Sequence, residues 1–136
     1  MKRILVLLFL SIYYPIEAQC WESASGGSGH SVALQTDGTI WSWGNSCCSE
    51  PGGAIFTAYS PTQIGTSNDW MSVSTESSGS IAIKNDGSLW FWGAWNGNTN
   101  VPSQVGTDVD WALAVAGFSG CFAIKTNHTL WGWGSN

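Results

Sequence analysis

One eight-residue segment recurs three times along the chain, and it constrains the fold more than any other feature. Asp86–Gly93 reads Asp-Gly-Ser-Leu-Trp-Phe-Trp-Gly, with an upstream copy at Asp37–Gly44 and a diverged downstream copy at Asn127–Gly134. Asp-Gly favours a two-residue type I′ hairpin turn, in which both central residues need positive φ. After the turn, Leu89 and Phe91 point to one face of a strand and the two tryptophans to the other. A strand with large side chains on both faces belongs between two packed layers.

The repeat is longer than this segment, because a tryptophan precedes each turn by 16 residues, at Trp21, Trp70 and Trp111. The spacing is 49 residues between the first two tryptophans and 41 between the last two. A period near 40–50 residues is typical of propeller blades or solenoid units. No segment shows a helical period. The sequence predicts an all-β chain of β-propeller-type repeats, roughly three four-stranded blades with the third incomplete. The units span about residues 21–65, 70–106 and 111–136.

The N-terminal segment has the pattern of a signal peptide. Lys2 and Arg3 precede an apolar run, Ile4–Ile12, and Ile16-Glu17-Ala18 resembles a cleavage site. The apolar run is too short to span a bilayer. We therefore expect residues 1–18 to be a signal peptide and residues 19–136 to be a partial β-propeller. The expected location is secreted, periplasmic or at the cell surface, without a membrane span.

Charge and cysteine content narrow the possible partners. The formal net charge is −5, and only 10% of residues are charged. An acidic chain lacks the basic footprint that nucleic acids and anionic lipids select. In an oxidising compartment four cysteines allow three pairings. The disulfide candidates are Cys20, Cys47, Cys48 and Cys121, of which the adjacent pair is poorly suited to join to itself.

The first unit resembles a known repeat. Gly27–Gly44 follows the pattern Gly-x-x-His-Ser-x-Ala-Leu-x-x-Asp-Gly-x-x-Trp-x-Trp-Gly, which is similar to the repeat of the regulator of chromosome condensation family. The later units depart from it at Gly79 and Gly120, where the pattern has His, and at Asn127-His128, where it has Asp-Gly. The resemblance covers Trp21–Asn136 and implies propeller blades; family members build seven, and this chain supplies barely three.

The same resemblance implies protein binding. Some relatives act as guanine-nucleotide exchange factors and others as secreted inhibitors of enzymes. An exchange role requires a cytosolic or nuclear GTPase, which the signal peptide contradicts.

No residue pattern predicts catalysis or a cofactor. His30 is the only histidine at a motif position, and we expect it to make structural hydrogen bonds within its blade. Asp37 and Asp86 recur at the turns and fit hairpin formation better than acid–base chemistry. The chain has no nucleophile elbow, metalloprotease helix or phosphate-binding loop. We therefore expect no enzymatic activity, no cofactor and no metal site.

Two variable loops carry the remaining candidate residues. Asn45–Ser60 and Ala94–Val101 occupy the same place in successive units, so both emerge on one face of a repeat array. Interleaved aromatic and asparagine side chains suit protein or sugar recognition, although they could equally cap the strand ends. The partner-binding candidates are Phe56, Tyr59, Trp95, Asn96 and Asn98.

Three functional hypotheses follow from these loops. The leading one is a secreted, non-enzymatic repeat protein that binds a partner protein through propeller loops. The alternatives are a carbohydrate-binding surface protein, and a fragment of a larger propeller enzyme or enzyme inhibitor. Because terminal repeats leave an apolar face open, we also expect further blades from a longer chain or self-association.

The signal-peptide interpretation predicts cleavage after Ala18. N-terminal sequencing of the exported protein should begin at Gln19. Recovery of exported protein that still begins at Met1 would contradict the expected location.

Overall fold

The structure is a computed structural model. It describes residues 20–49, 55–77, 79–93 and 99–134, with side chains described throughout except at 46–49, 55, 56, 99 and 100. These residues form three antiparallel sheets and no helix. Within them there is accordingly no helix long and apolar enough to cross a membrane. The all-β prediction is confirmed.

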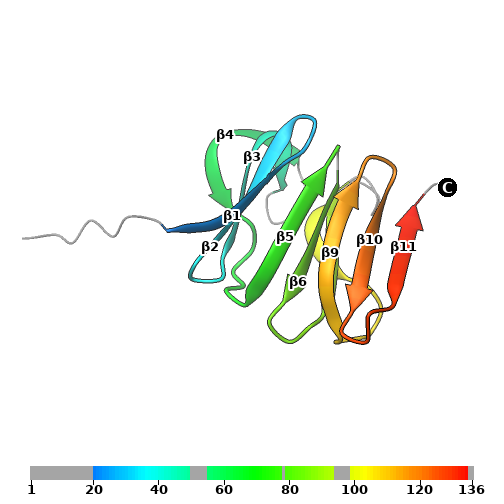
Figure 1. Cartoon of the computed structure of the whole chain (residues 1–136). Helices are drawn as coiled ribbons and strands as arrows, with labels where there is room; N and C mark the ends of the chain where they lie inside the picture. The colour runs from blue at the N-terminus through cyan, green and yellow to red at the C-terminus, as the bar shows by residue number, and fades with distance from the viewer. Residues whose placement is uncertain (1–19, 50–54, 78, 94–98, 135–136) are drawn as a thin grey trace, which may run out of the picture.

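Each sheet is a meander in which strands that follow one another in sequence pair with one another, and each corresponds to one blade. Blade 1 comprises β1 (Trp21–Gly26), β2 (His30–Gln35), β3 (Ile40–Ser49) and β4 (Ile55–Gln63). Blade 2 comprises β5 (Trp70–Glu76), β6 (Gly79–Lys84), β7 (Leu89–Gly93) and β8 (Thr99–Gln104). Blade 3 has three strands among the described residues: β9 (Trp111–Gly117), β10 (Gly120–Lys125) and β11 (Leu130–Gly134). Figure 1 shows the three sheets side by side in chain order.

The recurring turn differs from the predicted type I′ turn. Gly38 N–H donates to the Gln35 carbonyl at 2.9 Å, so Thr36 and Asp37 are the central turn residues. Of the residues in this turn only Gly38 has positive φ, at 80°, and Gly87 has the same φ in the second turn. In the third turn His128, with φ 66°, takes the place of this glycine. The loop is therefore a three-residue hairpin with a left-handed third residue.

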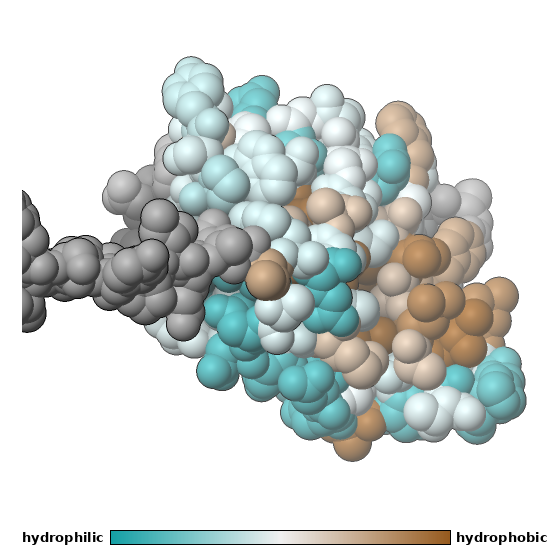
Figure 2. Space-filling model, turned by 60° about the vertical axis from the view of Figure 1, so that its left-hand side comes forward, coloured by the Kyte–Doolittle hydropathy of each residue, from teal (hydrophilic) through white to brown (hydrophobic). Residues whose placement is uncertain are grey.

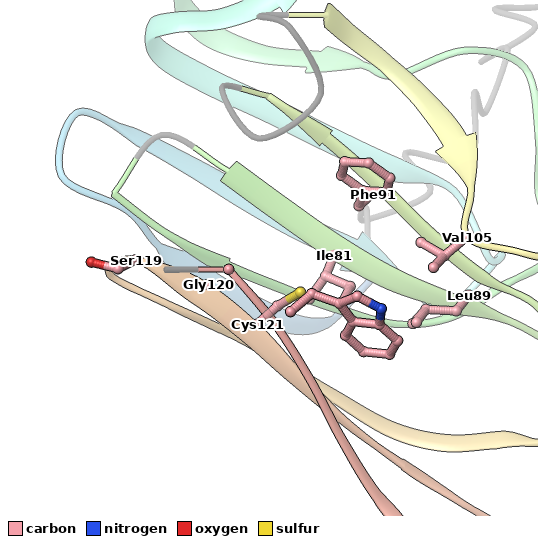
Figure 3. A pocket seen from close by; sticks show the side chains of 9 residues that line it. Ile81, Leu89, Phe91, Val105, Ser119, Gly120 and Cys121 are labelled. Carbon is pink, nitrogen blue, oxygen red and sulfur yellow. The ribbon is translucent and has the colours of Figure 1, made fainter. Parts of the chain in front are cut away.

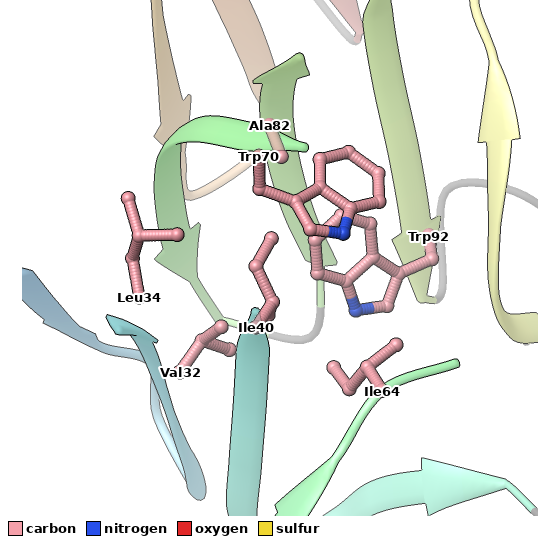
Figure 4. Packing of buried hydrophobic residues seen from close by; sticks show 7 residues of the cluster. All are labelled: Val32, Leu34, Ile40, Ile64, Trp70, Ala82 and Trp92. Carbon is pink, nitrogen blue, oxygen red and sulfur yellow. The ribbon is translucent and has the colours of Figure 1, made fainter. Parts of the chain in front are cut away.

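Blades pack through two chemically different faces. The tryptophan face carries the alternate residues that include the Trp-x-Trp pair, and the aliphatic face carries the residues between them. Between blades 1 and 2, the aliphatic face of blade 1 meets the tryptophan face of blade 2 (Figure 4). The buried cluster there is Val32, Leu34, Ile40, Ile64, Trp70, Ala82 and Trp92. The same arrangement recurs between blades 2 and 3, where Ile81, Ile83 and Leu89 meet Trp111, Ala114, Cys121 and Ala123.

Three tryptophans stack in the same way on each blade. In blade 2, the Trp70 ring lies 5.9 Å from Trp90, edge to face, and 6.2 Å from Trp92. Lys84 Nζ lies 4.8 Å from the Trp70 ring centroid and 3.1 Å from Asp69 Oδ1. The cation, its carboxylate and the aromatic faces together hold the end of the blade in place, a geometry in which rings attract a cation.

The turn glycines dock against the next blade. The Gly38 carbonyl accepts a hydrogen bond from Trp70 N–H, and the Gly87 carbonyl accepts one from Trp111 N–H, both at 3.1 Å. A Cβ atom added to Gly87 would lie 2.2 Å from the Val109 carbonyl oxygen. Glycine is therefore required here for both its φ and its close approach.

Two glycines with positive φ provide a matched test of that packing. Gly106 has φ 63° and open space where a methyl group would stand, whereas Gly87 has φ 80° and the carbonyl clash. Gly106→Ala should cost about 1–2 kcal/mol through the left-handed backbone alone. Gly87→Ala should cost about 1–3 kcal/mol more, because the neighbouring blade must move. Chemical denaturation measures both, and equal losses would show that the docking contact contributes nothing.

Candidate functional site

The most polar contact between blades is centred on His30. Its Nε2 atom lies 2.7 Å from Thr75 Oγ1 and 3.5 Å from Ser80 Oγ, both on blade 2. The Thr75 hydroxyl donates to the Gly79 carbonyl at 2.9 Å, and the Ser80 hydroxyl donates to Thr75 Oγ1 at 3.0 Å. Since Thr75 has one hydroxyl proton, it must accept from His30, which places the imidazole proton on Nε2.

These hydrogen bonds link blade 1 to blade 2. Burial lowers the pKa of His30, so the ring is neutral at pH 7. Its partners are a threonine and a serine, and no carboxylate among the described residues is bonded to it. We predicted that the hydrogen bonds of His30 lie within its own blade, and this was wrong. They join His30 on blade 1 to Thr75 and Ser80 on blade 2, which lie 45 and 50 positions later in the sequence.

The interface between blades 2 and 3 lacks this polar cluster and contains a cavity. Gly79, Ala116 and Cys121 stand where the first interface has His30, Thr75 and Ser80, so the hydrogen-bonding groups are gone. The cavity has a volume of about 300 Å³. Figure 3 shows the side chains that line it. They are Ile81, Leu89, Phe91 and Val105 from blade 2 and Ser119, Gly120, Cys121, Trp133 and Gly134 from blade 3.

The cavity can hold an apolar group but offers little chemistry. Cys121 is buried, and burial raises the pKa of its thiol, so the unreactive protonated form dominates. Cys121 also forms no disulfide bond, so the predicted disulfide is not supported at this residue. Cys20 is exposed, and the side chains of Cys47 and Cys48 lie outside the described part. Among the described residues no three His, Cys, Asp or Glu side chains gather as metal ligands would.

Of the five predicted partner-binding residues, the structure describes the side chain of one. Tyr59 lies on β4 and is 96% exposed. Phe56 also lies on β4, but its side chain is not described. Trp95, Asn96 and Asn98 lie outside the described residues. All five assignments stay predictions.

Sequence reasoning missed Phe118, which is 78% exposed in the turn between β9 and β10. In a meander the turn after the first strand and the connection after the third emerge at one end of the sheet. Asn45 N–H donates to the Gly29 carbonyl at 2.7 Å, which confirms that proximity in blade 1. Phe118 therefore lies at the end predicted to carry the binding loops. Ser28 and Ser77 occupy the same position in the first two units, so aligning the units would have revealed the aromatic replacement.

The comparisons agree with the geometry of the blades. Residues 21–50 match the family model of the Regulator of chromosome condensation (RCC1) repeat. The chain contains an RCC1-type repeat. The sheets of blades 2 and 3 repeat the topology of the unit that matches, so the predicted resemblance is confirmed. A comparison with curated proteins finds no match.

Solved structures share the fold. Human WBSCR16 superposes with a TM-score of 0.73 and 24% sequence identity over 84% of this chain. Prp20p from Saccharomyces cerevisiae superposes with a TM-score of 0.65 and 19% identity, and yeast RCC1 (Prp20) bound to Kap60 with 0.66 and 20%, each again over 84% of this chain. The chain spans about a third of the length of these structures, with 33%, 33% and 32% of each covered. At these identities the likeness establishes the propeller-blade fold alone.

Burial of Cys121 predicts low reactivity. In the native chain this thiol should be alkylated at least several-fold more slowly than in denaturant, because it is shielded and its raised pKa reduces the thiolate fraction. Since its folded pKa exceeds the unfolded one, the thiol should reduce stability only as pH rises through the alkaline range. Pulsed labelling with peptide mapping isolates Cys121 from the other cysteines. Labelling at the unfolded rate would show that the cavity is open to reagent.

Proposed function

We propose that this chain is a secreted repeat protein without catalytic activity that binds a partner protein through one end of its blades. The RCC1-type repeat supports a binding role, because the similar yeast protein Prp20p has binding properties toward Gsp1p and histones. The predicted signal peptide favours an exported partner over a nuclear one. The acidic net charge of −5 favours a partner surface that is neutral or basic.

One observation carries the proposal: two aromatic side chains project from the described surface with little contact to the protein. Tyr59 is 96% exposed and Phe118 is 78% exposed. Aromatic side chains are enriched at the centres of protein interfaces, where they fill pockets on the partner. Phe118 occupies a turn where the other blades have serine, so its bulk serves no repeated structural purpose. The predicted loop residues Phe56, Trp95, Asn96 and Asn98 would extend this surface.

The experiment replaces the exposed aromatics and uses an exposed apolar residue at the opposite end as control. Photo-crosslinking from position 118 identifies the partner, whose affinity is then measured for Tyr59→Ser, Phe118→Ser and Val109→Ser. Val109 is 58% exposed in the connection to β9, beside the Gly87 turn. We expect each aromatic replacement to cost about 2 kcal/mol of binding, roughly 30-fold. Val109→Ser should leave affinity unchanged, and all three should keep unfolding free energies within about 0.5 kcal/mol.

Two outcomes would overturn the proposal. Equal loss of affinity in all three variants would place the interface elsewhere or indicate a general effect on folding. Specific retention on a glycan array, lost with Tyr59→Ser and without any protein crosslink, would establish the carbohydrate-binding alternative.

A further inference from the structure

Blade 3 exposes an aliphatic face that the other two blades bury. Ile81 and Leu89 on blade 2 are fully buried, but their equivalents on blade 3, Phe122 and Leu130, are 51% and 68% exposed. Most of the large hydrophobic side chains exposed among the described residues belong to blade 3. In Figure 2 the hydrophobic residues, coloured brown, are concentrated on one side of the visible face. A contiguous exposed apolar patch marks an interaction surface.

Blade 1 leaves the complementary face uncovered. Trp21 is 40% exposed, whereas its equivalents Trp70 and Trp111 are each 4% exposed because a preceding blade covers them. Ala24 and Gly26 on the same strand are exposed as well. The chain thus presents at one end the aliphatic half of its own blade-to-blade interface, and at the other end the tryptophan half.

Residue sizes along the first strand of each terminal blade, β1 and β9, are complementary across these two open faces. Inside the chain, small serines of one blade meet the next blade: Ser25 Oγ accepts a hydrogen bond from Thr75 N–H at 2.9 Å, and Ser74 Oγ accepts one from Ala116 N–H at 3.0 Å. On the open face of blade 3, Leu113 and Val115 stand at the positions that Ser72 and Ser74 occupy on blade 2.

The opposite face changes in the opposite direction. The positions of Val73 and Thr75 on blade 2 correspond to Ala24 and Gly26 on blade 1. A Cβ atom added to Gly26 would meet nothing within 4 Å, so space is available there. Larger residues on the open face of blade 3 thus have smaller counterparts on the open face of blade 1, a match that close packing across an interface requires.

We propose that the aliphatic face of blade 3 docks onto the tryptophan face of blade 1 of a second copy of this chain. Such a head-to-tail contact is heterologous, and it either closes into a ring or continues as a filament. The contact therefore predicts an assembly of two or more copies.

The test measures the molar mass of the full exported chain by light scattering. Wild type should have at least twice the mass of one chain. Gly26→Leu fills the space on the tryptophan face, and Leu130→Asp places a charge on the aliphatic face. Each should give a monomer at the same concentration, with unchanged circular dichroism. Tyr59→Ser, which alters neither face, should keep the wild-type mass, and this separates the contact from the proposed partner-binding surface.

Mixing the two monomeric variants tests the head-to-tail geometry. Gly26→Leu keeps a working blade 3 face and Leu130→Asp keeps a working blade 1 face, so an equimolar mixture should regain a one-to-one dimer with a single contact. Leu113→Ser with Val115→Ser restores the blade 2 residues and should weaken the assembly. A wild-type monomer at every concentration, an assembly insensitive to Gly26→Leu, or no recovery on mixing would each overturn the proposal, the first leaving these faces to blades of another chain segment.

Discussion

The packing of a tryptophan face against an aliphatic face is the interaction on which the rest of the structure depends. A single sheet has two apolar faces and cannot bury either by itself, so each blade requires a neighbour. Blade 2 has neighbours on both sides, and its β6 is buried from Gly79 to Ile83. Ala82 supplies the close approach on one face while Ile81 and Ile83 fill the other. The hairpin turns and the His30 hydrogen bonds then fix how two already matched surfaces align.

Much of this could be predicted from the sequence because each unit has the same 16-residue spacing from its tryptophan to its turn. The alternation of Leu89 with Trp90 and Trp92 assigns faces without any three-dimensional information. The turn type could not be read from Asp-Gly alone, because a second local interaction decides it. Asp37 Oδ1 accepts from Thr39 N–H at 3.0 Å and from the Thr39 hydroxyl at 2.6 Å. These bonds lower the pKa of Asp37, the hydroxyl contributing most. They hold Asp37 as a central turn residue and leave positive φ to the next residue.

The candidate sites were less predictable because they arise between units rather than within one. His30 was correctly interpreted as structural, yet its partners Thr75 and Ser80 belong to another blade and are invisible to a motif. The cavity beside Cys121 likewise lies between two blades, with lining residues from blade 2 and from blade 3. Phe118 shows the same limit, since its exposure depends on the turn that holds it. The pattern within one repeat shows which residues lie on each face of a blade. Successive repeats must be compared to find how each interface between blades differs.

The two internal interfaces are not interchangeable, and this difference favours one order of blades. If the aliphatic face of blade 1 met the tryptophan face of blade 3, the His30 Nε2 proton would face Ala116 and Cys121 instead of Thr75 and Ser80. A buried donor left without its acceptor costs about 1–3 kcal/mol. The pairing of blade 1 with blade 2 is thus protected against the wrong neighbour by a polar group, as specificity often requires. Among the described residues, the interface between blades 2 and 3 has no equivalent of the buried His30 donor, and its one side-chain hydrogen bond is that from Ala116 N–H to Ser74 Oγ. Steric fit therefore contributes more to the choice of neighbour there. On the open face of blade 3, the larger Leu113 and Val115 would favour a neighbour with small residues opposite them.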